Sequence, residues 1–262
     1  MIITLLTDFG TADYFAGAMR GAVLAANPLA RVVDITHEVP PYDVEAGAYM
    51  LRAAFETFPE GTVHVGVVDP GVGSARRGIV VEGRGHIFVG PDNGLFGYVY
   101  ERVRPFRVFQ LTNTEFFRRE VSPTFHGRDI FAPVAGALSR GVRAEGLGPE
   151  VSDFVRLPSG SVERAADGTL VGAVIHVDRF GNLVTNITPE DLSEEAVARG
   201  ARLRVAGREV RQFRRFFAEG VEGSGEPLAV WGSAGLLEVA VFRDSAARVL
   251  GAGRGDKVLV NL

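Results

Sequence analysis

The sequence contains no cysteine among its 262 residues. This absence excludes disulfide bonds, zinc–thiolate sites, iron–sulfur clusters and cysteine nucleophiles. Lysine is almost as scarce, since Lys257 is the one lysine among 28 basic residues. Arginine in place of lysine is compatible with heat adaptation, and genomic base bias would produce the same pattern. The absence of cysteine directs attention to aspartate, arginine and histidine as the candidate catalytic residues.

The sequence also lacks long apolar runs and strong charge. No stretch approaches the ~20 apolar residues that a membrane helix needs. The start MIITLLTDFG has no basic segment of the kind that opens a signal peptide. A formal net charge of −4 with mixed signs gives no electrostatic case for nucleic acid. We expect a cytoplasmic protein that binds neither membranes nor nucleic acid.

Strand and helix patterns alternate through the first part of the chain. Nearly continuous apolar strands separated by amphipathic helices predict an α/β domain whose mainly parallel sheet is covered on both faces. A hairpin is expected around Gly83-Arg84-Gly85. The predicted strands are 2–7, 31–36, 63–68, 79–81 and 86–89, and the predicted helices are 13–27, 43–57, 93–102 and 128–140.

The pattern changes near residue 150. Leu157-Pro158-Ser159-Gly160 reads as a linker, and short strand candidates separated by glycine-rich turns follow it. This pattern of short strands and turns predicts a smaller all-β domain, either a barrel or a sandwich. We place the domains at 1–157 and 168–262. The predicted strands of the second domain are 169–178, 183–186, 202–205, 228–231, 237–241 and 257–260.

Polar residues follow the first and third strands, where a parallel sheet binds its ligands. Asp8 directly follows the first strand, and its carboxylate could accept two hydrogen bonds from a ribose diol or simply close a turn. Asp13 could cap the next helix. Asp69 follows the third strand, before a glycine-rich turn that leads to Arg76 and Arg77. That segment lacks the G-x-G-x-x-G spacing of a phosphate loop, and a turn closed by an Asp–Arg pair is the alternative.

Two further clusters carry candidate chemistry. His126 precedes a predicted helix, a position that lowers the pKa of an imidazole and favours its neutral form. In the second domain, Phe180 and Asn182 flank Gly181, so they could stack on and read a purine, or form a β-turn with Phe180 in the core. The other histidines show no metal-ligand spacing. No G-x-S-x-G motif is present, so a serine hydrolase has no support.

Taken together, these clusters resemble one known family. The motifs are T-D-F-G-T-x-D at 7–13, V-D-P-G-V-G-S-x-R-R at 68–77, P-D-N-G-L at 91–95, P-T-F-H-G-R-D at 123–129 and F-G-N-x-x-T-N at 180–186. Their order over nearly the whole chain is similar to that of the S-adenosyl-L-methionine (SAM) hydroxide adenosyltransferases. These enzymes are related to the fluorinases and chlorinases.

The resemblance implies specific roles. Asp69, Arg76 and His126 would surround an attacking water, with Arg76 keeping the Asp69 carboxylate charged and in one plane. Asp8 would hold the ribose hydroxyls, and Asn182 with Phe180 would contact the adenine. The further substrate-binding candidates lie in or beside the same motifs and in two other turns: Asp13, Tyr42 beside the ribose, Asn93, Phe125, Asp178 near the methionine amino group, and Ser233.

The resemblance also implies hydrolysis of SAM to adenosine and methionine without a metal or cofactor, by a homotrimer whose sites lie between subunits. Where fluorinases carry a Tyr at the Asp69 position and a halide-binding Ser at the Gly127 position, this chain has Asp and Gly, which argues against halide chemistry. The alternatives are a halogenase, a nucleoside-binding regulatory protein with incidental turnover, and, more distantly, a Rossmann oxidoreductase. The segment 242–246 does not match the family cleanly.

Overall fold

A computed structural model describes residues 1–157, 161–219 and 225–261. The chain divides into two compact units, Met1–Ser159 and Gly160–Leu262. The last three residues of the predicted linker, Pro158 to Gly160, lie outside the described residues. The predicted domain limits at 157 and 168 therefore stay predictions.

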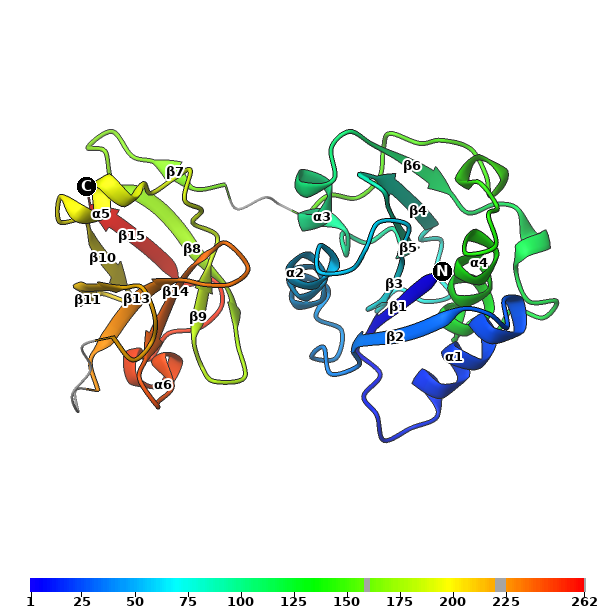
Figure 1. Ribbon diagram of the computed structural model, residues 1–262, viewed down its shortest axis with the longest axis horizontal. Helices are drawn as coiled ribbons and strands as arrows, with labels where there is room; N and C mark the ends of the chain where they lie inside the picture. The colour runs from blue at the N-terminus through cyan, green and yellow to red at the C-terminus, as the bar shows by residue number, and fades with distance from the viewer. Residues whose placement is uncertain (158–160, 220–224, 262) are drawn as a thin grey trace. The chain divides into compact units, whose positions relative to one another are not determined.

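The Met1–Ser159 unit is built on a six-stranded sheet of order β2-β1-β3-β5-β4-β6 (Figure 1). The strands β2, β1, β3 and β5 run parallel, whereas β4 pairs antiparallel with both β5 and β6, so the sheet is mixed. Its strands are β1 (Ile2–Thr7), β2 (Arg31–Thr36), β3 (Val63–Val67), β4 (Gly78–Gly83), β5 (His86–Pro91) and β6 (Phe106–Gln110).

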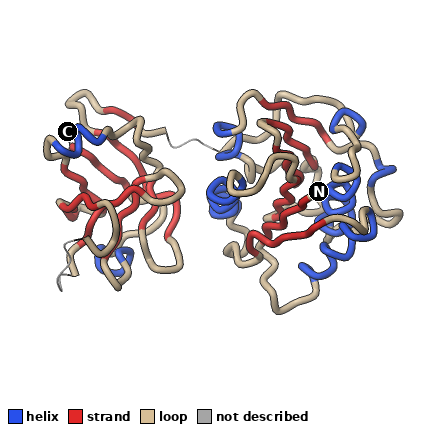
Figure 2. The backbone as a smooth tube through the Cα atoms, viewed as in Figure 1, coloured by secondary structure: helices blue, strands red, loops and turns tan. Residues whose placement is uncertain are grey.

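Helices cover both faces of this sheet (Figure 2). Ile3 and Leu5 of β1 pack with Met19 of α1 and with α4, whereas Leu6 packs with α2 and α3 on the other side. This alternation follows from the two-residue period of a strand. The helices are α1 (Phe15–Ala26), α2 (Val44–Phe55), α3 (Gly97–Arg102) and α4 (Ala132–Leu138), with short turns η1 (Thr114–Phe116), η2 (Gly127–Phe131) and η3 (Ala144–Gly146).

The predicted elements of this unit are largely confirmed, with corrections at helix starts. The hairpin of β4 and β5 forms around Arg84 and Gly85, which both have positive φ. The first helix begins at Phe15 with Tyr14 as its N-cap, so Asp13 is not the cap. The third helix begins at Gly97 rather than at 93. The segment 127–138 is a π-helical turn followed by α4, and β6 was not predicted.

The Gly160–Leu262 unit is a nine-stranded, nearly closed barrel-like sheet. Its path is β11-β10-β15-β8-β9-β14-β13-β12, with β7 beside β8. The six predicted strands are confirmed to within one residue at either end. Three further short strands and two five-residue helices were not predicted, so the described part of this unit is not all-β. The elements are β7 (Glu163–Arg164), β8 (Leu170–Val177), β9 (Leu183–Thr185), α5 (Glu194–Ala198), β10 (Arg202–Val205), β11 (Arg208–Val210), β12 (Gln212–Arg214), β13 (Pro227–Trp231), β14 (Leu237–Val241), α6 (Ala246–Leu250) and β15 (Lys257–Asn261).

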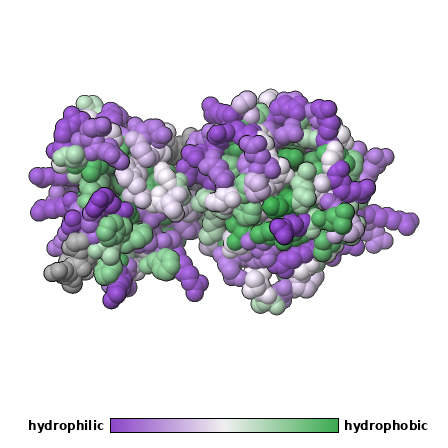
Figure 3. Space-filling model, viewed as in Figure 1, coloured by the Kyte–Doolittle hydropathy of each residue, from purple (hydrophilic) through white to green (hydrophobic). Residues whose placement is uncertain are grey.

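Hydrophilic residues dominate the periphery of both units in the view of Figure 3, and apolar residues gather around β1 and β2. Among the described residues, none of the helices combines the length and the apolar character required to cross a bilayer.

Candidate active site

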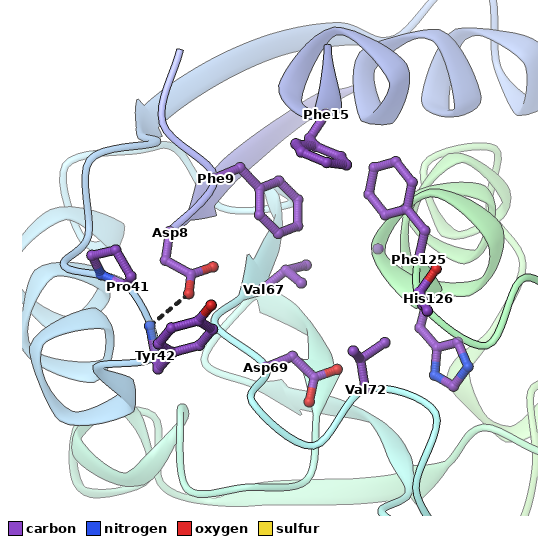
Figure 4. A pocket seen from close by; sticks show the side chains of 12 residues that line it. Asp8, Phe9, Phe15, Pro41, Tyr42, Val67, Asp69, Val72, Phe125 and His126 are labelled. Atoms are coloured by element: carbon purple, nitrogen blue, oxygen red, sulfur yellow. Dashed lines mark hydrogen bonds between the residues drawn. The ribbon is translucent and has the colours of Figure 1, made fainter. Parts of the chain in front are cut away.

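A pocket of about 340 Å³ opens in the Met1–Ser159 unit where β1 and β3 end (Figure 4). These two strands are parallel neighbours, so their carboxyl ends meet at one edge of the sheet. Asp8 follows β1 and Asp69 follows β3, and both carboxylates line the pocket. The lining is completed by Phe9, Phe15, Pro41, Tyr42, Val67, Val72, Thr124, Phe125, His126 and Gly127.

Asp8 is held by the backbone of the segment opposite. The Tyr42 amide donates a hydrogen bond of 2.8 Å to Oδ2 of Asp8. Burial raises the pKa of Asp8, and the nearby Asp69 charge adds to this, while the Tyr42 amide opposes it. Tyr42 itself has a φ of 66°, which is unusual for a non-glycine residue, and its side chain is 73% exposed. Strained backbone of this kind concentrates at functional sites.

Arg76 joins the other two predicted catalytic residues. Its Nε donates to both Asp69 oxygens at 2.9 and 3.0 Å, and its Nη2 also contacts Asp69. The same Nη2 donates to Nδ1 of His126 at 3.0 Å. The Asp69 side chain is only 4% exposed and that of Arg76 11%. The guanidinium lies 5.2 Å from the Phe131 ring centroid, so charge pairing and ring packing hold it in one orientation.

Glycine is required where the Asp69 loop meets the segment that carries His126. Gly73 has a φ of 78°, and a Cβ built there would lie 2.2 Å from the carbonyl oxygen of Pro123. No side chain fits that gap, because the neighbour is backbone. The two loops therefore pack directly against each other, and this packing places Asp69 close to His126. The loop leads into β4 and not into a helix, so the phosphate-loop interpretation is wrong.

His126 is neutral in this arrangement. Because Arg76 can only donate, Nδ1 of His126 accepts and the ring proton lies on Nε2, free to hydrogen-bond a water. Burial lowers the pKa of His126, and the Arg76 charge lowers it further. This direction agrees with the prediction, and burial and Arg76 are causes that the sequence did not reveal. His126 also stands at the N-cap of the helical segment that η2 and α4 form.

An aromatic wall closes one side of the pocket. The Phe125 ring packs edge-on against Phe9 at 5.8 Å and Phe15 at 5.3 Å between centroids. Phe125 is 7% exposed and lines the pocket as the sequence suggested. Phe9 and Phe15 were not predicted, because an apolar residue beside a strand or on a helix reads as core. Asp13 is exposed in the loop before α1 and is not among the residues that line the pocket, so its substrate role stays a prediction.

Asn93 supports the strand end that carries Asp69. Its Nδ2 donates to the Val68 carbonyl at 2.8 Å, and its Oδ1 accepts from the Leu95 amide at 3.2 Å. These bonds use the Asn93 side chain to brace the backbone next to Asp69. A direct contact of Asn93 with substrate stays a prediction.

A second pocket of about 630 Å³ lies in the Gly160–Leu262 unit and includes Phe180 and Asn182. Phe180 is 77% exposed, so the alternative that placed its ring in the core is wrong. A Cβ at Gly181 would lie 2.1 Å from the Ser245 hydroxyl, so glycine lets this loop pack on α6. Further lining residues that sequence reasoning missed or left undecided are Phe217, Val241, Phe242, Arg243, Asp244 and Ser245.

Asp178 organises the loop of this second pocket. Its carboxylate accepts from the amides of Phe180 and Asn182 and from the side chain of Asn182, at 2.8 to 2.9 Å. Ser233 is exposed in the turn between β13 and β14. Neither Asp178 nor Ser233 is among the residues that line the two pockets described above. The substrate contacts of Asp178 and Ser233 stay predictions. Across residues 1–157, 161–219 and 225–261, no group of three or more histidine, aspartate or glutamate side chains could hold a metal ion.

Comparison with protein-family models decides the family. The model of the SAM hydroxide adenosyltransferase N-terminal domain matches residues 3–148, and that of the C-terminal domain matches residues 172–259. The chain belongs to the SAM hydroxide adenosyltransferase family. Among family members, a protein of Thermus thermophilus named (R)-S-adenosyl-L-methionine hydrolase is 40% identical over 98% of both chains. A protein of the same name from Methanocaldococcus jannaschii is 34% identical over 98% of this chain and 94% of its own length.

More distant and structural relatives agree with this membership. A fluorinase of an Actinoplanes species is 29% identical over 78% of this chain and 77% of its own length. A crystal structure of an uncharacterized conserved protein from Thermotoga maritima superposes with a TM-score of 0.89 at 36% identity, covering both chains fully. A conserved hypothetical protein from Thermus thermophilus gives a TM-score of 0.77 at 40% identity, covering 99% of both chains.

Proposed function

We propose that this chain hydrolyses SAM to adenosine and L-methionine, with Asp69, Arg76 and His126 positioning the attacking water and Asp8 holding the ribose. The observation that carries the proposal is the single guanidinium of Arg76, which binds both the Asp69 carboxylate and Nδ1 of His126 beside the pocket that Asp8 lines. The named hydrolases at 40% identity over nearly the whole chain support the same reaction.

The leaving group in this reaction needs little assistance to depart. The oxygen of water forms a bond to C5′ of the ribose while the C5′–sulfur bond breaks, and that electron pair returns to sulfur as a neutral thioether. The water must be held in line at about 3–3.5 Å from C5′. It becomes acidic as it attacks, so Asp69 orients it and accepts its proton, which then passes to solvent. Nε2–H of His126 provides a second hydrogen bond that fixes the water oxygen.

The remaining contacts hold the nucleoside. Asp8 accepts from the ribose hydroxyls, and Tyr42 covers the sugar from the segment that binds Asp8. Phe180 and Asn182 contact the adenine, and Phe217 lies in the same pocket where a second ring could pack on a purine.

No cofactor takes part, and the chain forms a homotrimer in which neighbouring subunits complete each site. Sedimentation equilibrium tests the trimer, and a monomeric active enzyme contradicts it.

Isotope labelling tests the reaction directly. Incubation with SAM in oxygen-18 water should give adenosine that carries one heavy oxygen at C5′, together with unlabelled methionine. The same incubation with added fluoride or chloride should give no 5′-halogenated nucleoside. Release of adenine, or formation of a halogenated product, would contradict the proposal.

Two substitutions separate chemistry from binding. Asp69→Asn should lower kcat by about 100-fold or more, the range expected for loss of a general base, while adenosine affinity stays near that of the parent. Asp8→Ala should weaken adenosine binding by about tenfold, because a buried hydrogen-bonded contact is lost. Calorimetry with adenosine and steady-state kinetics measure both. Parental turnover in Asp69→Asn, or unchanged affinity in Asp8→Ala, would remove that residue from its role.

A further inference from the structure

We propose that His37 is a positioning residue for Asp8, acting through the hydroxyl of Thr7. His37 lies outside the motifs that identify the family, and it is 3% exposed. It directly follows β2, whereas Thr7 is the last residue of β1 and precedes Asp8. The inference rests on the proposed function, because it assigns how the ribose-binding carboxylate is held.

A register shift brings His37 and Thr7 together. The parallel pairing of β1 with β2 runs Leu5 to Asp34 and then Leu6 to Thr36, which leaves one extra residue on β2. Without that extra residue, Thr36 would stand beside Thr7. Bulges of this kind re-aim side chains next to active sites. Here the shift places the His37 ring beside Thr7, with Nδ1 at 2.8 Å from Oγ1.

The far side of the ring is anchored by charge. Nε2 of His37 lies 3.1 Å from Oδ1 of Asp34, which is itself ion-paired with Arg20. Burial raises the pKa of Asp34, but the bonds from Arg20 and His37 outweigh it and give a net lowering, so Asp34 is a stable acceptor. Nη2 of Arg20 also lies 3.5 Å from Nε2 of His37, but the Asp34 oxygen is nearer, so we assign the ring proton to Nε2, donating to Asp34. Nδ1 of His37 then accepts from the Thr7 hydroxyl. The hydroxyl oxygen in turn accepts from the Phe9 amide at 3.3 Å.

The backbone of the same segment clamps the loop that carries Asp8. The Gly10 amide donates to the His37 carbonyl at 2.7 Å, and the Val39 amide donates to the Thr7 carbonyl at 3.3 Å. With the Tyr42 amide on its carboxylate, Asp8 is tied to one segment on both sides. The order Asp–His–Thr is also that of a nucleophilic relay. Thr7 is fully buried, so its hydroxyl cannot reach a substrate, and the relay can only hold the loop.

The chain offers a matched control. The Thr4 hydroxyl lies 2.8 Å from Nδ1 of His64, the same pairing on the same strand, and Thr4 is equally buried. Neither Thr4 nor His64 lines the pocket around Asp8. Thr7→Val and Thr4→Val remove the same hydroxyl at constant shape. A general loss of stability would affect both variants, whereas a positioning effect belongs to Thr7 alone.

The experiment measures kcat and KM for SAM, and the thermal midpoint, in Thr7→Val, His37→Ala, His37→Asn and Thr4→Val. We expect Thr7→Val and His37→Ala to raise KM about tenfold, the scale of one lost buried hydrogen bond, with kcat within about threefold. His37→Asn keeps an acceptor near the Nδ1 position and should restore part of the KM. Thr4→Val should leave KM unchanged despite a similar fall in midpoint.

Combining Thr7→Val with Asp8→Ala tests whether His37 and Thr7 act through Asp8. If His37 acts through Asp8, then Thr7→Val should change KM by less than about twofold in the Asp8→Ala background. Additive effects, or an equal rise of KM in Thr4→Val, would overturn the proposal. A KM equal to that of the parent in folded Thr7→Val would also overturn it. If Thr7→Val fails to fold, a parental KM in both His37→Asn and His37→Ala would do the same. A parent enzyme that does not convert SAM to adenosine would instead refute the proposed function. That outcome is seen without any variant, so it is distinguishable from failure of the His37 proposal.

Discussion

Individual side chains in this protein gain their roles from their immediate partners. Asp8 and Asp13 both follow β1, yet Asp8 lines the pocket while Asp13 is exposed in the turn before α1. Asp8 differs because the Tyr42 amide orients its carboxylate. Arg76 likewise stands out from Arg77, which pairs with Asp92 and Asp153 instead of with Asp69. The sequence lists such candidates, and contacts select among them.

The pH dependence of turnover follows from His126. Protonation of its Nδ1 would break the bond from Arg76, so activity needs the neutral ring. Burial and Arg76 lower the pKa of His126 from 6.5, so the neutral form persists to lower pH than for a free histidine. We expect half-maximal kcat/KM on the acid side at a pH below 6.5. A pH–rate profile checks this, and an acid limb centred above that value contradicts it.

Arg76→Gln provides the control for this assignment. Loss of the guanidinium charge removes one of the two causes that lower the pKa of His126. The acid limb of the residual activity should therefore move to higher pH than in the parent. If the acid limb of the pH–rate profile does not move, the limb reports the titration of a group other than His126.

At the scale of elements, strand order and loop packing assemble the site. The β1–β3 pairing sets Asp8 and Asp69 at one edge of the sheet. The contact of Gly73 with Pro123 then brings the His126 segment onto the Asp69 loop. Neither contact is local in sequence. The hairpin and most strands follow from local patterns, whereas the Arg76–His126 bond depends on these long-range contacts.

Substitution of the two loop glycines should have unequal effects. A Cβ at Gly73 would lie 2.2 Å from the Pro123 carbonyl oxygen, whereas a Cβ at Gly71 would make an ordinary contact at 3.5 Å with the Arg76 side chain. Gly73→Ala should lower kcat by about 100-fold, the effect of a displacement near 1 Å in a catalytic group. Gly71→Ala should stay within about threefold of the parent. Comparable kinetics in the two variants would contradict this role of the loop contact.

The whole molecule consists of two units with separate hydrophobic cores. The core of Met1–Ser159 lies on both faces of its sheet, and that of Gly160–Leu262 fills the barrel-like sheet. The first core also contains a buried polar chain in which Thr4 bonds His64, and Nε2 of His64 lies 3.1 Å from His86. Burial, with a smaller contribution from His86, lowers the pKa of His64 to about 3.

Acid should therefore destabilise the first unit through His64. Between pH 6.5 and about 3 the unfolded chain binds a proton on this residue that the folded unit excludes. The free energy of unfolding should then fall by up to about 1.4 kcal/mol for each pH unit of acidification in that window. At neutral pH the contribution is absent. Denaturant unfolding across this range measures the slope, and His64→Asn should reduce it; an equal slope in both proteins would contradict the assignment.

The sequence by itself determined most strands, the helices of the first unit apart from their exact bounds, the change from an α/β to a mainly β pattern, and the candidate residues. These follow from local periodicity, turn residues and the order of motifs along the chain. Two helix starts were predicted wrongly; that of α1 was missed because its N-cap, Tyr14, makes no side-chain hydrogen bond. The strand β6 was missed for a different reason, because its antiparallel pairing with β4 is a long-range contact.

The resemblance predicted that Asp69, Arg76 and His126 share one site, and only the tertiary structure supplied the bonds that join the candidates. One guanidinium binds Asp69 and His126, which lie 57 residues apart, and the ring of His37 supports Thr7 across a register shift. Tyr42 contributes a backbone amide to Asp8 in addition to an exposed ring. Hydrogen bonds of about 3 Å depend on how loops from different strands pack, and no local pattern encodes that packing.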